Sequence, residues 1–239
     1  MADQPTSKQE QKQRETSQET IVQPTPHQQE IKLYPVDEGA QDPSFTAFRE
    51  KLIEAARKHD TDFILSILDP QILNSFGGDG GIKEFKEQWK LVEPDTSKLW
   101  KELVSILANG GSFINFDGKK EFCAPYVSSQ WEKVANQLPT GQDGVDYAAV
   151  AAEKVDLRLE PNLAAPVIGT LSYNIVKIDY DASVPDERDS DYFAWIKVTS
   201  ASGQQGYVPG KYVISPTGYR ACFKKVGEKW NMTSLVAGD

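Results

Sequence analysis

Apolar residues at helical spacing mark the first ordered part of the chain. Phe45, Phe48 and Leu52 predict a helix that Asp42 or Ser44 can cap. Three further segments show the same period: 61–68, which a proline at position 70 stops, 82–89, and 99–107, which ends at a glycine pair. The segment from position 42 to about 110 is therefore predicted to be mainly helical.

The apolar period changes to two after residue 111, which favours β-strands. Ser112–Phe116 and Glu121–Val127 predict a hairpin around Asp117-Gly118, followed by one or two helical turns over 131–138 and a linker over 139–144. A second hairpin, 219–226 and 229–236, closes the chain. Because an isolated hairpin is marginal in water, we expect it to join the helical region in one α+β domain.

Five short segments between these two regions read as strands, and the first of them alternates apolar and polar residues and ends at a proline. They are Val155–Pro161, Pro166–Leu171, Ile175–Ile178, Trp195–Val198 and Gly206–Val213. Their order resembles the bacterial SH3 (SH3b) family, in which a V-x-V-R-x-x-P strand, a P-V-I-G-T-L turn, a W-x-K-V strand and a G-W/Y-V strand recur. The chain departs from that pattern in the long, acidic, glycine-free loop before Trp195. The resemblance covers about a quarter of the chain and implies a small all-β barrel.

These patterns divide the chain into three parts. Residues 1–41 form a polar tract rich in Gln, Thr, Pro, Glu and Lys, which we expect to be disordered because it cannot bury enough apolar surface. Residues 42–140, completed by 218–239, form the α+β domain, and residues 147–215 form the SH3-like barrel inserted within it. The terminal hairpin Gly-Glu-Lys-Trp-Asn-Met also resembles the closing strands of NTF2-like folds.

The composition of the chain restricts which partners and which cellular location we expect for this protein. The formal net charge of −9 argues against nucleic acid or an anionic membrane as the partner, since both need a basic surface. No apolar run reaches the ~20 residues of a membrane span. No secretory signal opens the chain, so such a signal is absent or removed, and an anchor could lie upstream. SH3b modules are mostly exported, so the resemblance implies a periplasmic or cell-surface protein that the polar tract could tether.

The two cysteines, Cys123 and Cys222, each lie in a predicted strand, one in the first hairpin and one in the last. If the two hairpins share a sheet, a disulfide is geometrically possible, and an exported protein would keep it. The alternative is a pair of buried thiols, since free cysteine is among the most buried residue types.

The chain holds little catalytic machinery. Its two histidines are His27, in the polar tract, and His59, at a helix end. Cys123 stands in Phe-Cys-Ala-Pro with no suitable histidine after it, which disfavours a Cys–His peptidase. The glycine-rich stretch 77–81 lacks the Lys-Ser/Thr of a phosphate-binding loop, and the carboxylates of 179–191 lack calcium-loop spacing. We therefore predict no enzyme, no cofactor and no metal.

Binding is expected to use aromatic residues of the barrel. The candidates are Tyr173, Tyr192, Trp195, Tyr207 and Tyr212. Tyr173 and Tyr192 are expected to be exposed, whereas the position of Trp195 at the start of its strand favours a core residue, and Tyr207 and Tyr212 fit either role. The resemblance implies that the ligand is peptidoglycan or an envelope protein. The alternative is a small-ligand site or enzyme pocket in the α+β domain near Trp89, Trp100, Phe113 and Tyr126. The oligomeric state does not follow from the sequence.

Overall fold

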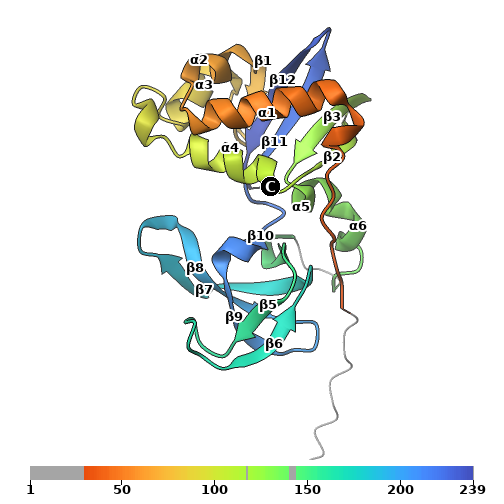
Figure 1. Ribbon diagram of the computed structural model, residues 1–239, viewed down its shortest axis with the longest axis vertical. Coiled ribbons are helices and arrows are strands. Elements are labelled where there is room, and N and C mark those ends of the chain that lie inside the picture. Colours follow the sequence, from red (N-terminus) through yellow and green to blue (C-terminus); the bar gives the residue numbers. More distant parts are fainter. Residues whose placement is uncertain (1–29, 117, 140–143, 239) are drawn as a thin grey trace, which may run out of the picture.

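The computed structural model describes residues 30–116, 118–139 and 144–238, and it is an α+β structure built on two sheets (Figure 1). We call residues 43–138 together with 219–238 the α+β unit, and residues 147–214 the curled sheet. The two lie one above the other along the long axis of the molecule (Figure 1). The expected linker residues 140–143, the turn residue Asp117 and the tract 1–29 with His27 fall outside the described residues.

Six α-helices belong to the α+β unit. They are α1 (Pro43–Arg57), α2 (Thr61–Ser66), α3 (Gly81–Gln88), α4 (Leu99–Ala108), α5 (Tyr126–Gln130) and α6 (Glu132–Ala135). The first helix begins as the sequence predicts, because the Asp42 carboxylate accepts hydrogen bonds from the backbone N–H groups of Ser44 and Phe45. Asp60 caps α2 in the same way, accepting from the N–H of Phe63.

The sheet of the α+β unit has five strands in the order β1-β12-β11-β3-β2. Their bounds are β1 (Leu68–Leu73), β2 (Ser112–Phe116), β3 (Lys119–Ala124), β11 (Arg220–Val226) and β12 (Lys229–Val236). All neighbours are antiparallel except β1 and β12, which are parallel. The hairpin at the end of the chain thus lies beside the hairpin at its middle. Helices α1 and α4 cross one face of this sheet (Figure 1).

An aromatic cluster fills the space between α1 and the sheet. The ring of Phe45 lies 4.1 Å from that of Phe122 and 4.9 Å from that of Trp230, measured between centroids. Phe113 and Phe223 complete the cluster. Aromatic side chains contribute much buried area each, so this cluster holds α1 on the sheet.

Two segments of the α+β unit differ from expectation. The helix predicted over 61–68 ends at Ser66, and Leu68 begins a strand that the sequence did not predict; proline is tolerated in this strand because β1 is an edge strand with β12 as its one neighbour. Tyr126–Gln130 is a helix and not part of a strand, since β3 ends at Ala124 and the N–H of Tyr126 donates to the carbonyl of Asn109.

The second sheet is strongly curled and has seven antiparallel strands in the order β10-β4-β7-β8-β9-β5-β6. Their bounds are β4 (Tyr147–Val150), β5 (Val155–Arg158), β6 (Val167–Leu171), β7 (Ile175–Asp186), β8 (Asp189–Thr199), β9 (Gln205–Pro209) and β10 (Val213–Ile214), with the 3₁₀ helix η4 (Gly210–Tyr212) before β10. The acidic segment expected as a solvated loop is instead the extended end of the β7–β8 hairpin. The chain enters the curled sheet through β4 and leaves it through β10, and these two strands pair with each other.

The segment 30–41 is ordered, although the sequence predicted it to belong to a disordered tract. It runs along both sheets: Lys32 pairs with Asn174 of the curled sheet, and Asp37 pairs with Gly111 beside β2. Leu33 is only 5% exposed and packs into a cluster with residues of both units. The mean composition of residues 1–41 is polar and does not reveal the short alternation of apolar residues within 30–41. That alternation allows this segment to pair as a strand.

Cys123 and Cys222 form a disulfide. They stand directly opposite each other on β3 and β11, with their Cα atoms 4.1 Å apart. The bond joins positions 99 residues apart and so closes the chain around the whole curled sheet. Within the described residues, no helix is both long and apolar enough to cross a bilayer.

Candidate functional site

A groove of about 850 Å³ opens on the curled sheet. Three segments form its walls: residues 153–163 around β5, residues 186–195 at the β7–β8 hairpin, and residues 209–212 at the end of β9 and in η4. The volume lies within the range of ordinary ligand pockets. The groove is open to solvent and can therefore take a segment of a longer polymer.

Three aromatic side chains, which we call the aromatic wall, line the groove, and two of them, Phe193 and Tyr212, also pack against the hydrophobic core of the curled sheet. Phe193 and Trp195 come from β8, and Tyr212 comes from η4. Strand alternation explains the position of Trp195: Ile196 and Val198 point into the core of the curled sheet, so Trp195 points outward and is half-buried. The wall thus offers flat apolar surface that also carries an indole N–H and a phenol O–H, a common composition at binding sites.

Arg158 shapes the wall on the other side. Its guanidinium donates to the carbonyls of Leu163 and Ala165, both at 2.9 Å, and to the Asp156 carboxylate at 2.6 Å. These bonds fold the loop between β5 and β6 back on the strand. Arg158 is therefore a positioning residue for the loop.

The five aromatic residues predicted to bind ligand fall in different places. Trp195 and Tyr212 line the groove. Tyr207 lies elsewhere on the sheet, with the Lys197 ammonium 4.6 Å from its ring centroid. Tyr173 and Tyr192 are half-buried rather than exposed.

The partners of those last two tyrosines come from distant parts of the chain. The Tyr173 ring lies 5.5 Å from that of Tyr34, in the ordered segment before α1. The Lys101 ammonium of α4 lies 3.4 Å from the centroid of the Tyr192 ring. Strand patterns within the curled sheet contain no information on either partner. Phe193 is the groove aromatic that the sequence analysis missed, and its spacing of two from Trp195 was the available signal.

The hairpin that forms part of the groove is attached to α4. Lys98, the N-cap residue of α4, forms ion pairs with Asp189, at 2.9 Å, and with Asp191. Lys101 adds a longer contact of 3.4 Å to Asp189. These contacts join the two units at the far end of the β7–β8 hairpin.

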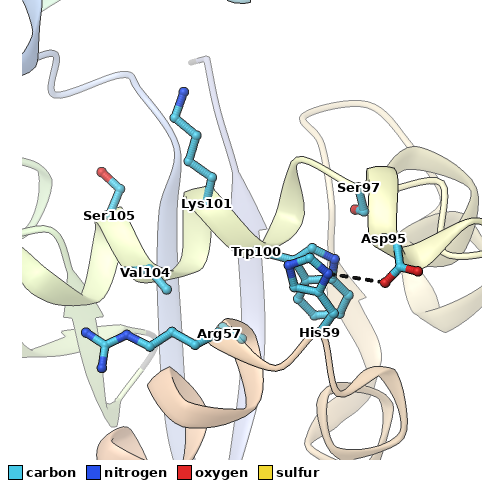
Figure 2. Close-up of a pocket in the computed structure, with 9 residues that line it drawn as sticks. Arg57, His59, Asp95, Ser97, Trp100, Lys101, Val104 and Ser105 are labelled. Atoms are coloured by element: carbon cyan, nitrogen blue, oxygen red, sulfur yellow. Dashed lines mark hydrogen bonds and ion pairs between the residues drawn. The ribbon is translucent and has the colours of Figure 1, made fainter.

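A second, shallower hollow lies in the α+β unit (Figure 2). The imidazole of His59 stacks on the Trp100 ring, with centroids 5.1 Å apart, and its Nδ1 lies 3.4 Å from an Asp95 oxygen. Figure 2 shows Arg57 and Lys101 extending away from this ring pair. Asp95 is therefore the one charged side chain labelled in Figure 2 that contacts the imidazole.

Three of the four aromatic residues of the alternative pocket serve as packing. Trp89 is buried against Tyr219, with ring centroids 5.0 Å apart. Phe113 belongs to the cluster around Phe45, and Tyr126 is 1% exposed between the two units. Burial raises the pKa of the Tyr126 phenol to about 12, so it stays protonated. Trp100 is the one member of this set that lines a hollow.

In two other places, a possible metal site and a possible phosphate site, the groups that could bind a ligand are engaged with other protein groups. Within the described part of the chain, Glu121, Cys123 and Cys222 are the group whose ligand atoms lie close enough to hold a metal, but both sulfurs are joined in the disulfide. In the glycine-rich loop before α3, the N–H of Gly80 donates to the Glu84 carboxylate at 3.0 Å. A carboxylate at that helix end disfavours a bound phosphate.

Comparison with known proteins adds no assignment: no protein family, no curated sequence and no solved structure matches this chain.

Proposed function

We propose that this chain is a non-catalytic binding protein of the bacterial cell envelope. In this proposal the curled sheet is an SH3-like barrel of the SH3b kind, and its groove binds peptidoglycan or a segment of an envelope protein. The observation that carries the proposal is the aromatic wall of Phe193, Trp195 and Tyr212 in an open groove. Such a wall buries much ligand area at a small loss of side-chain entropy.

The disulfide supports an exported location. Disulfides form and persist in the periplasm, at the cell surface and outside the cell, and they are rare in the reducing cytosol. Cys123 is 4% exposed, and the bond lies within the sheet of the α+β unit. A periplasmic or cell-surface location follows from the proposal.

Sedimentation with purified peptidoglycan sacculi tests the peptidoglycan form of this function, and a cross-linking pull-down from envelope extracts tests the protein form. We expect the wild-type chain to be retained in one of them, and the variant W195A/Y212A to lose at least tenfold of that retention. The variant Y207A is the control, because it removes a half-exposed tyrosine of the same sheet outside the groove. Circular dichroism of each variant checks folding. Equal retention of all three proteins would contradict the proposal.

The hollow at His59 supports a second candidate, a small-ligand site in the α+β unit. The specific observation is the imidazole stacked on Trp100 beside the Asp95 carboxylate. In a fluorescence screen of small aromatic and anionic metabolites, quenching of tryptophan that is lost in H59A and retained in W195A/Y212A would favour this candidate over the groove.

A further inference from the structure

Three of the four basic side chains that line the groove are available to a ligand, whereas Arg158 is bound to protein groups. Lys154, Arg188 and Lys211 line it, and all three are exposed. Among the residues that the structure describes, none of the three forms an ion pair. Lys211 is placed 4.8 Å from the centroid of the Tyr212 ring, so one cation stands directly beside the aromatic wall.

The acidic side chains of the groove, in contrast, each have a partner within the protein. Asp156 is paired with Arg158, at 2.6 Å. Asp186 accepts from the backbone N–H of Arg188 at 2.9 Å. Glu153 accepts a hydrogen bond from the Tyr173 hydroxyl. Of these three carboxylates only Asp156 is paired with a cation among the described residues. Four basic and three acidic side chains thus line the groove, an excess of one positive charge in a chain whose net charge is −9.

The apolar part of the groove restricts which anion fits. Leu163, which is 76% exposed, lines the groove together with Trp195 and Tyr212, and Pro209 stands opposite Trp195 on the neighbouring strand. An inorganic polyphosphate has no apolar group to cover these side chains. An extended peptide can offer carboxylates and apolar groups together, because successive side chains of an extended chain point in opposite directions.

We infer that the groove selects extended peptides in which Asp or Glu side chains, or a free terminal carboxylate, alternate with apolar side chains. Lys154, Arg188 and Lys211 bind the carboxylates, and Phe193, Trp195 and Tyr212 take the apolar groups. This inference rests on the proposed binding function of the groove. It adds the charge of the ligand, which the resemblance to SH3b does not give.

A random-peptide display library, selected on the immobilised full chain, tests this specificity. We expect the retained peptides to be enriched severalfold in Asp and Glu next to Leu, Pro or aromatic residues. The triple variant K154Q/R188Q/K211Q should bind the most enriched peptide about tenfold more weakly, a loss of a few exposed ion pairs. Replacing the acidic residues of that peptide by their amides should weaken its binding to the wild-type chain by a similar factor.

A matched control removes the same charge elsewhere. The variant K83Q/K119Q/K229Q changes three exposed lysines that do not line the groove, and its affinity should equal that of the wild type. Retained peptides with a neutral or basic consensus, whose binding W195A still abolishes, would overturn the inference and leave the binding function intact. Failure of the wild-type chain to retain any peptide through the groove would count against both.

Discussion

At the scale of single residues, the carboxyl group of Glu102 shows how the junction between the two units affects ionisation. Glu102 lies on α4 close to the β7–β8 hairpin. Burial is the largest cause that raises its pKa from 4.5 to about 6, and Asp189 and Asp191 act in the same direction. Lys98 and Lys101 oppose them. The folded protein thus holds this proton more tightly than the unfolded chain does.

Stability should therefore fall as the pH rises through the titration of Glu102. The contribution of the protonated group is fully present below pH 4.5 and is lost by the time the pH has passed 6. We expect E102Q to raise the free energy of unfolding by about 1 kcal/mol at pH 7, because the amide carries no charge to desolvate. Urea denaturation of both proteins at pH 4 and pH 7 measures this. An equal difference at both pH values would show that the effect is not ionisation.

The exposure of single side chains was only partly predictable from the sequence. Trp195 was identified from its strand motif, and the alternation with Ile196 explains why it faces the groove. The half-burial of Tyr173 and Tyr192 was not predictable, because Tyr34 and Lys101 reach them from other parts of the fold. Local periodicity describes the face of a strand and contains no information on which distant segment covers that face.

At the scale of elements, the β7–β8 hairpin connects the groove to α4. It contributes Asp186, Arg188 and Phe193 to the groove, and its Asp189 and Asp191 bind lysines of α4. The hairpin is long, and residues near its end have few neighbours other than these lysines. Ion pairs with exposed partners are screened by salt, so the position of this wall should depend on ionic strength.

The variant K98Q/K101Q should free the end of the hairpin. We expect faster amide hydrogen exchange at residues 184–192 and unchanged exchange in β4 and β5, because only the hairpin loses its contacts with α4. The variant K83Q removes a lysine from a solvent-exposed pair with Glu87 and serves as the control. Unchanged protection of 184–192 in K98Q/K101Q, measured at low salt, would mean that the strand pairing alone holds this wall.

Helices and hairpins were predictable where the apolar period was long and its ends were marked. The cap Asp42 and the glycines after α4 placed two helix ends correctly. Strand β1 was missed because its pairing partner, β12, lies at the other end of the chain. The order of segment 30–41 was missed for a related reason: Leu33 is apolar in a polar context, and the surface that buries it is built by later residues.

At the scale of the whole molecule, the disulfide links the residues that precede and follow the curled sheet in the chain. Its two cysteines are 99 residues apart, and closing a loop of this length stabilises by up to ~4–5 kcal/mol in the chain-entropy estimate.

Removing the disulfide should therefore lower the stability of the α+β unit. We expect C123A/C222A to lose about 2–5 kcal/mol of unfolding free energy, because its unfolded chain is less constrained. The wild-type protein unfolded in urea with excess dithiothreitol should show a similar loss, which separates the effect of the bond from that of the substitutions. A denaturation midpoint that neither change moves would show that the bond adds no stability.

The pairing of β4 with β10 has a mechanical consequence. The curled sheet is joined to the rest of the chain at Tyr147 and Ile214, which lie at the same end of this strand pair, with Ile214 opposite Ala149. A pulling force that separates those two connections acts at one end of the strand pair. It therefore breaks the hydrogen bonds between β4 and β10 one after another, instead of loading all of them at once. The disulfide, in contrast, keeps β3 and β11 of the other sheet covalently joined.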